Sequence, residues 1–299
     1  MQNYNHCLRP IFTENIVKTL IKGESINIYG VKGQGRKRLL EDLRNCQLDY
    51  TQMLLINIRN FACSYQGFLE AFAKEIGYVG DAAPKLGDLV NELERDNGNR
   101  KTVILLHNFD SLFDNEKLHE DYGIRFFDSL NAIKNRQNMA LVCVTEKPHK
   151  SYMVYAKEVV DHGSWLELQP KRLPLLNLEQ VSEEAQQHFS ALYSGEPDLF
   201  GKMVISHRLP YSLLEYFVDR LNNQEDTDIA FAERLEKWRK EFDEDYSRVN
   251  YVSVNRFTQH IKNLFGALEI RNIFNKVIKT VFYDFPNAIV DIVKHITKK

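Results

Sequence analysis

Short apolar runs alternate with amphipathic segments along roughly the first 170 residues of the chain. The segments with apolar residues at helical spacing are Leu8–Lys22, Arg38–Arg44, Ser64–Ile76, Pro84–Arg95 and Ile124–Asn135. The apolar runs have the length of buried strands and lie at Ser25–Tyr29, Met53–Ile58, Val103–Leu106, Met139–Thr145 and Ser164–Gln169. This alternation predicts an α/β fold with a doubly wound, parallel, five-stranded sheet and right-handed crossovers.

The pattern changes at Leu173-Pro174, after which it is helical throughout. Helices are predicted at Ser182–Tyr193, Pro210–Leu221, Ile229–Phe242, Phe257–Phe282 and Pro286–Ile296. We therefore predict an α/β domain at 1–172, an all-α lid at 173–222 and a C-terminal helical domain at 223–299. Residues 225–245 contain nine acidic and four basic residues, whereas residues 248–299 contain nine Lys or Arg and three acids. The last helices therefore form either a packed subdomain or a surface for a partner or nucleic acid.

The first predicted strand runs into a glycine-rich turn and a helix, in the sequence SINIYGVKGQGRKRLL. This matches the frame of a P-loop, G-x-x-x-x-G-K-[ST], in which backbone N–H groups cradle phosphates and the hydroxyl binds Mg²⁺. Gly30 and Gly35 hold the two glycine positions, Arg36 replaces the Lys, and Lys37 replaces the Ser or Thr. Arg can bind phosphate with altered geometry, but Lys37 has no acceptor for a cation and repels one.

A second departure follows the strand at Val103–Leu106. An intact P-loop ATPase carries the Walker B acid and a neighbouring acid here, which hold Mg²⁺ and activate water. This chain has His107 and Asn108 instead, and neither supplies negative charge at neutral pH. Asp110 lies three residues beyond His107, and we interpret it as a loop or capping residue. Thr145 ends the following strand, at the sheet edge where ligands bind in open α/β folds.

Composition excludes several other classes of protein. The chain has 299 residues, 43% of them hydrophobic, which is typical of a soluble globular protein of about two compact units. Its four cysteines show no C-x-x-C spacing, the first residues do not resemble a cleaved signal, and no apolar run approaches ~18 residues. These features predict a cytoplasmic protein without a membrane span. The net charge of -2 gives no global attraction to nucleic acid, so such binding would need a local patch.

Four motifs in order resemble the AAA+/STAND group of P-loop ATPases, over roughly Ile11–Leu221. They are GVKGQGRK, VILLHNFD, FFDSLNAIKNRQNMALVCVT and HRLPYSLLEYF. In such families a Pro-containing lid helix faces the nucleotide, which implies that Pro210 and Tyr211 do so here. The resemblance also implies that Thr145 is sensor-like, and that ATP or ADP is the cofactor, without a confident Mg²⁺. The family usually hydrolyses ATP, but this chain departs from it at the P-loop Lys and hydroxyl and at both Walker B acids.

The predicted site is therefore a nucleotide-binding one, with no catalytic residue and no metal ligand assigned. Its residues are Gly30, Gly33, Gly35, Arg36, Lys37, Arg38, His107, Asn108, Thr145 and Pro210. We expect Lys32, Arg36 and Lys37 to form a cationic patch at the mouth of the cleft.

Three functions remain open from the sequence. One is a pseudo-ATPase that acts as a regulatory or scaffolding subunit with protein partners in a multi-subunit or oligomeric complex. Another is an active ATPase whose site is completed by a neighbouring protomer. The third is a nucleic-acid-associated adaptor that uses Lys32, Arg36, Lys37 and Arg38 with the basic C-terminal helices.

Overall fold

The structure is a computed structural model, in which the elements with assigned bounds form a parallel sheet with flanking helices and a further set of helices after it. It describes residues 4, 6–46, 48–80, 84–96, 100–113, 115, 117–148, 151–153, 163–188 and 196–246. Contacts divide the chain into two compact units, Met1–Arg239 and Lys240–Lys299, and the helices and strands with assigned bounds all belong to the first. The helices predicted at Phe257–Phe282 and Pro286–Ile296 lie outside the described residues.

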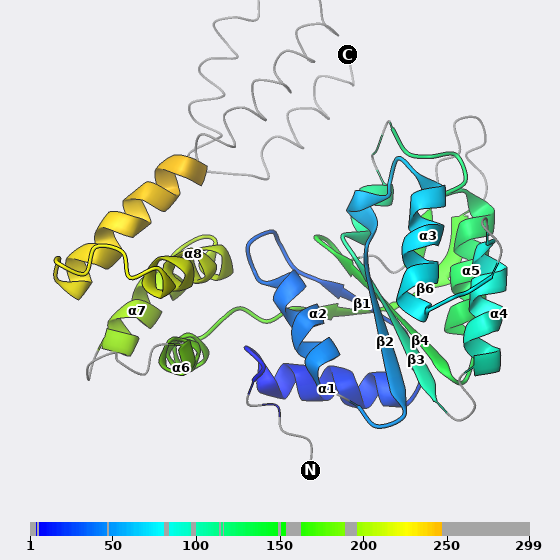
Figure 1. The fold of residues 1–299 in the computed structure, drawn as a ribbon, viewed down its shortest axis with the longest axis horizontal. Helices are drawn as coiled ribbons and strands as arrows, with labels where there is room; N and C mark the ends of the chain where they lie inside the picture. Colours follow the sequence, from blue (N-terminus) through cyan, green and yellow to red (C-terminus); the bar gives the residue numbers. More distant parts are fainter. Residues whose placement is uncertain are drawn as a thin grey trace, which may run out of the picture. The chain divides into compact units, whose positions relative to one another are not determined.

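A parallel five-stranded sheet forms the centre of the first unit, as predicted. Its strand order is β2-β3-β4-β1-β7, with crossovers between strands that are not neighbours in sequence (Figure 1). The strands are β1 (Ile26–Tyr29), β2 (Thr51–Asn57), β3 (Lys101–His107), β4 (Met139–Thr145) and β7 (Gln169–Arg172). Parallel register puts the carboxyl ends of β1 and β4 side by side, with Tyr29 opposite Thr145.

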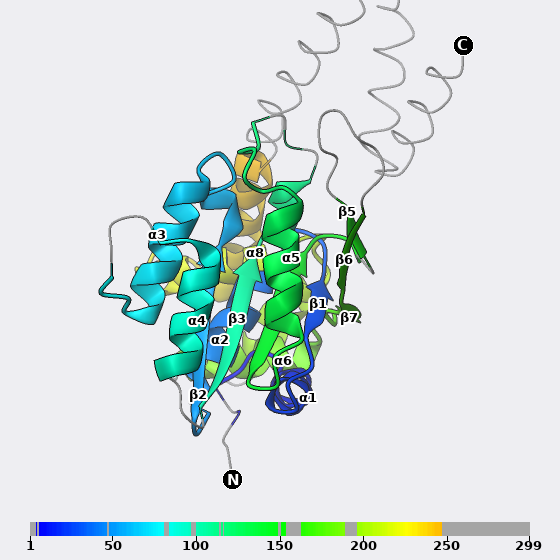
Figure 2. The same ribbon diagram turned by 90° about the vertical axis from the view of Figure 1, so that its right-hand side faces the viewer.

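The fifth strand differs from the prediction. The apolar run expected at Ser164–Gln169 instead forms β6 (Gly163–Glu167), which pairs antiparallel with β5 (Ser151–Met153) in a separate small sheet (Figure 2). The edge of the main sheet is β7, whose mostly exposed sequence QPKR carries no apolar pattern. An edge strand leaves one side unpaired, so it tolerates Pro170.

Helices cover both faces of the sheet (Figure 1). On one face lie α1 (Pro10–Ile21) and α2 (Arg36–Asn45), and on the other α3 (Tyr65–Ile76), α4 (Leu86–Asp96) and α5 (Ile124–Lys134). Successive side chains of β3 point to opposite faces of the sheet. Ile104 and Leu106 therefore belong to the hydrophobic core under α3, α4 and α5, whereas Val103 and Leu105 belong to the core under α1 and α2. Two short 3₁₀ helices, η1 (Ile58–Asn60) and η2 (Phe109–Leu112), follow β2 and β3.

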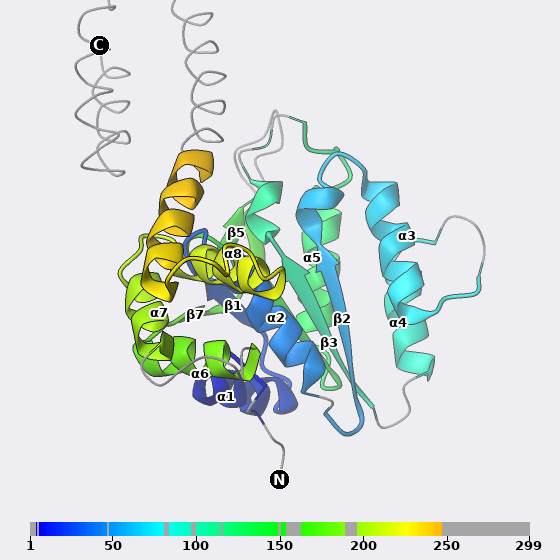
Figure 3. The ribbon, with the colours of Figure 1, turned by 60° about the vertical axis from the view of Figure 1, so that its left-hand side comes forward.

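Several helices follow β7, and the three with assigned bounds are here called the lid helices. They are α6 (Leu178–His188), α7 (Glu196–Ile205) and α8 (Pro210–Asn222), and they gather on the side of the sheet that carries α1 and α2 (Figure 3). Phe200 and Phe217 are fully buried, with ring centroids 5.5 Å apart, and Phe217 also packs near Trp238. The lid helices therefore have an aromatic core of their own. Among the described residues, no helix is both long and apolar enough to cross a bilayer.

Candidate nucleotide site at the P-loop

The glycine-rich turn between β1 and α2 has the backbone that its sequence predicts. Gly33 and Gly35 both have φ of +82°, a left-handed conformation that strains any residue with a side chain. Gly35 is the N-cap of α2, so the turn ends at the positive end of a helix dipole. Gly30 donates its N–H to the Thr145 carbonyl at 3.1 Å, which fixes the start of the turn against β4.

The start of α8 lies directly against this turn. The Tyr211 N–H donates to the Gly33 carbonyl at 3.0 Å. A Cβ on Gly33 would lie 2.7 Å from the Leu209 side chain, and one on Gly35 would lie 2.8 Å from the Tyr211 ring. The glycines are thus needed for contact with the lid as well as for the turn. Pro210 is the first residue of α8 and is buried, and the residues on either side of it make these contacts.

Arg36, at the position of the P-loop lysine, is only 8% exposed. Its Nη2 pairs with Glu146 Oε1 at 3.2 Å, and the Glu146 N–H donates to Asp110 Oδ2 at 3.1 Å. Arg36 Nη1 and Asp110 Oδ1 are both buried and form no hydrogen bond with any described residue. A carboxylate of the protein therefore already faces the cation that would bind phosphate, while one donor of that cation stays unsatisfied.

Lys37, the last residue of the motif, and Arg38, which follows it, are also paired. Lys37 is exposed and lies 3.2 Å from Glu41, one turn along the helix. Arg38 points to the lid helices, where it contacts both carboxylate oxygens of Glu184 at 2.5 and 3.2 Å, and it also binds Asp42 at 2.7 Å. Of the predicted basic cluster, Lys32 and Lys37 are exposed, whereas Arg36 is buried. Arg38 therefore joins the sheet domain to the lid.

The side chain of Asn108 contacts both His107 and the end of the neighbouring strand, β2. Asn108 has φ of +52° and donates its amide to Asn57 Oδ1 at 3.0 Å, and it lies 3.3 Å from His107 Nδ1. Burial, and next the positive charge of Arg36, lower the pKa of His107 to about 4. The imidazole is therefore neutral at neutral pH and supplies no negative charge for metal or water. Asn108 is committed to the packing of β2 against β3.

This lowered pKa predicts a measurable loss of stability in acid. Unfolded His107 titrates at its ordinary 6.5 and the folded residue near 4, so the unfolded state binds more protons between these values. The stability that neutral His107 provides is complete above about 6.5 and is lost as pH falls towards 4. Because the ring is partly exposed, we expect a loss of about 2 kcal/mol.

The measurement is urea unfolding at a series of pH values. His107→Asn should lack this part of the acid loss, whereas His119→Asn, at a more exposed histidine, should behave as the unsubstituted chain does. Equal pH dependence in all three proteins would contradict the assignment.

Thr145 is buried and its hydroxyl is used within the sheet. It accepts a hydrogen bond from Asn27 Nδ2 at 2.9 Å and donates to the Lys147 carbonyl at 2.6 Å. The residue that reaches the P-loop cation from this strand end is the next one, Glu146, which sequence reasoning did not select. Its position beside Thr145 was the available signal, since the sequence already placed this strand end at the cleft.

A second residue that the sequence analysis missed is Arg9. It is 1% exposed and donates to the Gln34 carbonyl at 2.7 Å and to the Pro174 carbonyl at 2.9 Å. Burial lowers its pKa to about 10, which leaves the guanidinium charged at neutral pH. Arg9 thus ties the P-loop backbone to the segment that leads into the lid helices. No periodicity in the sequence distinguishes it from a surface arginine.

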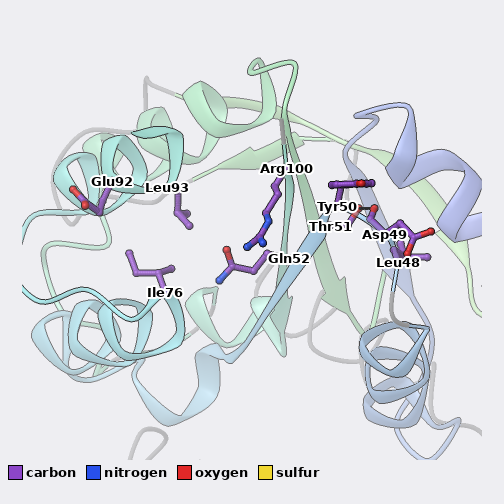
Figure 4. Close-up of a pocket in the computed structure, with 9 residues that line it drawn as sticks. All are labelled: Leu48, Asp49, Tyr50, Thr51, Gln52, Ile76, Glu92, Leu93 and Arg100. Carbon is purple, nitrogen blue, oxygen red and sulfur yellow. Dashed lines mark hydrogen bonds between the residues drawn. The ribbon is translucent and has the colours of Figure 1, made fainter. Parts of the chain in front are cut away.

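A pocket of about 770 Å³ lies away from the P-loop, at the amino-terminal ends of the sheet strands (Figure 4). It opens where β2 and β3 begin, whereas the P-loop follows the carboxyl end of β1. Its lining residues are Leu48, Asp49, Tyr50, Thr51, Gln52, Ile76, Glu92, Leu93 and Arg100. None of the predicted site residues lines it, so we do not assign it to a nucleotide.

Comparisons with known proteins agree with this architecture. No family model matches the chain, and no curated protein matches it. The Walker-type ATPase of Pyrococcus abyssi has a similar structure, with a TM-score of 0.57 at 11% identity over 84% of this chain and 76% of that one. The Aeropyrum pernix ORC2 protein, in ADPNP and ADP complexes, gives 0.55 at 14% identity over 78% and 68%.

The Aeropyrum pernix ORC1 protein, in complex with DNA, gives a TM-score of 0.53 at 14% identity over 78% of this chain. This chain spans just under two thirds, 65%, of that protein's length. At such low identity these similarities show the fold alone. The chain has the fold of AAA+ P-loop ATPases, a parallel five-stranded sheet followed by helices.

Proposed function

We propose that this chain is a AAA+-fold pseudo-ATPase, a regulatory or scaffolding subunit of a cytoplasmic multi-subunit or oligomeric complex. The observation that carries the proposal is the contact between Arg36 and Glu146. The cation that would bind nucleotide phosphate is neutralised by a carboxylate of the same chain. With Arg38–Glu184 and the Tyr211–Gly33 hydrogen bond, this contact supports a P-loop and lid that are held together by protein groups.

Nucleotide binding fits part of this site. Arg36 Nη1 is a buried donor without a partner among the described residues, and a phosphate oxygen would satisfy it. The backbone of Gly33 and Gly35 with Arg36 would hold the phosphates, which would compete with Glu146 for the guanidinium. A bound nucleotide would supply phosphate charge that takes the place of the Glu146 carboxylate. We expect such binding to be static.

Magnesium fits the site less well. The motif position that provides a hydroxyl ligand holds Lys37, an exposed cation, and the strand end holds neutral His107 and an amide, Asn108. Asp110 Oδ1 is a buried acceptor nearby. The other oxygen of the same carboxylate, Oδ2, already accepts a hydrogen bond from the Glu146 N–H. A hard cation prefers several oxygen ligands, which these residues do not provide together.

The test is the effect of magnesium on ADP affinity, measured by calorimetry with Mg²⁺ and again with a chelator. We expect the two affinities to agree within about twofold, because the motif positions supply neither a hydroxyl nor a carboxylate ligand for the metal. Lys37→Thr, which restores the hydroxyl, is the matched comparison. A tenfold or greater tightening by Mg²⁺ in the unsubstituted chain would contradict the proposal.

A second candidate function is binding to nucleic acid as an adaptor. The Aeropyrum pernix ORC1 protein has a similar fold and is in complex with DNA, and residues 248–299 of this chain contain nine Lys or Arg and three acids. Lys32 and Lys37 are exposed at the P-loop, but Arg36 and Arg38 are in internal ion pairs. DNA affinity that falls steeply with added salt would support this function.

A further inference from the structure

A cluster of soft ligands lies where the N-terminal segment meets the end of α2. A ring nitrogen of His6, Cys7 Sγ and Cys46 Sγ all lie within 4.8 Å of one another, and His6 Nε2 is 3.4 Å from Cys7 Sγ. Both cysteines are buried and His6 is exposed.

The backbone around the cluster is held in place by other contacts. The His6 carbonyl accepts a hydrogen bond from Arg38 at 3.2 Å, and the Leu8 N–H donates to Asp42 Oδ2 at 3.0 Å. Cys46 is the C-cap of α2, the same helix that carries Arg38 and Asp42. The two pieces of chain that bring His6, Cys7 and Cys46 together are therefore fixed to each other without any contribution from a metal.

A buried hydroxyl also lies beside the cluster. Thr13 is fully buried, and its Oγ1 has no hydrogen-bond partner among the described residues. The Thr13 hydroxyl is close enough to Cys7 to interact with the Cys7 sulfur. A thiolate at Cys7 would accept a hydrogen bond from Thr13 and satisfy this hydroxyl.

The ligand types and spacing match one class of cation. Zinc binds thiolate at about 2.3 Å and imidazole at about 2.0–2.1 Å in a tetrahedral arrangement. These bond lengths place a sulfur and a nitrogen ligand roughly 3.5 Å apart, close to the His6–Cys7 distance of 3.4 Å. Two thiolates neutralise a divalent cation. Asp42 adds no free charge to the cluster, because it is already paired with Arg38.

We propose that His6, Cys7 and Cys46 form a zinc site with a fourth position on the exposed side of His6, filled by water. On binding, each thiol releases one proton and each sulfur forms one bond to zinc, so two protons leave and no electron is transferred. Cys46 also gives up its hydrogen bond to the Asp42 carbonyl. The bound ion would clamp the N-terminal segment to α2.

The test is titration of the reduced, metal-stripped full chain with Co²⁺, followed by its absorption spectrum. We expect one Co²⁺ per chain with a thiolate-to-cobalt charge-transfer band, which Zn²⁺ abolishes by displacing the cobalt. Cys46→Ser should lower the affinity at least tenfold and weaken that band. Cys63→Ser, which changes the exposed cysteine, is the matched control and should leave both unchanged.

His6→Ala keeps the test decisive if Cys46→Ser does not fold, because His6 is exposed and its replacement leaves the core intact. We expect it to lower Co²⁺ affinity at least tenfold while the circular dichroism spectrum stays the same. Four titratable thiols without a charge-transfer band on adding Co²⁺ would overturn the proposal. So would a band that survives both His6→Ala and Cys46→Ser.

Discussion

Glu146→Gln should bind ADP at least about tenfold more tightly than the unsubstituted chain. The Glu146 carboxylate pairs with Arg36 at 3.2 Å, so phosphate must displace a charged partner before it can bind the guanidinium. A hydrogen bond to a charged group contributes about 1.5–3 kcal/mol, and about 1.4 kcal/mol corresponds to tenfold in affinity. The amide keeps the shape of the side chain and removes the competing charge. Calorimetry with a chelator present measures the gain.

Glu41→Gln is the matched control for this experiment. Glu41 pairs with Lys37 at the same N–O distance of 3.2 Å, but Lys37 is exposed and Arg36 is buried. Because exposed pairs contribute little, we expect ADP affinity to stay within about twofold. If Glu146→Gln and Glu41→Gln behave alike, the Arg36–Glu146 contact does not limit access to the P-loop.

Arg38→Ala should destabilise the fold by about 3 kcal/mol. The carboxylate side chains of Asp42 and Glu184 are 3% and 6% exposed, and Arg38 forms an ion pair with each of them. Removing one partner of a buried ion pair leaves uncompensated charge, which typically costs 3–5 kcal/mol. We take the lower value because Arg38 is itself partly exposed. Urea unfolding at neutral pH measures the change.

Lys37→Ala serves as the control for Arg38→Ala, since the two residues are neighbours in the first turn of α2. Its pair with Glu41 is exposed, so the expected change is below about 0.5 kcal/mol. Arg38→Lys should fall between the two, because an ammonium keeps the charge but loses the bidentate contact with Glu184. A loss below 1 kcal/mol for Arg38→Ala would show that Arg38 does not hold the lid helices to the sheet domain.

The sheet and its helices were predictable because their apolar patterns are local. Strands β3 and β4 are buried along most or all of their length and therefore read as continuous apolar runs, as in MALVCVT, which forms β4 and is buried throughout. The fifth strand escaped prediction because β7 is an exposed edge with the sequence QPKR. Its place beside β1 is set by backbone hydrogen bonds, which leave no mark in the side-chain pattern.

The site was predictable only in part, because its ion pairs join distant positions. Gly33 and Gly35, which the sequence analysis selected for the predicted site, both have left-handed backbone in the structure. Arg36 meets a residue 110 positions later, and Arg38 one 146 positions later. The sequence analysis placed both arginines at the phosphates because nothing in the sequence shows that Glu146 and Glu184 lie beside them. The domain boundaries at 172 and 222 stay predictions.

The altered catalytic positions should act as a group. An intact site needs a compact cation on the phosphates, ligands for Mg²⁺ and an acid that orients water, and such groups have strongly non-additive effects. Arg36→Lys alone leaves Lys37, His107 and Asn108 in place. We therefore expect Arg36→Lys to show no rate of ATP hydrolysis above background.

The most direct test of a pseudo-ATPase is ATP turnover by the purified full chain with Mg²⁺, followed as release of inorganic phosphate. Arg36→Ala provides the blank, because it removes the cation of the P-loop and leaves any contaminating activity unchanged. We predict that the chain, Arg36→Lys and Arg36→Ala all give the same background rate. Steady turnover that disappears in Arg36→Ala, or a large gain in Arg36→Lys, would contradict the proposed function.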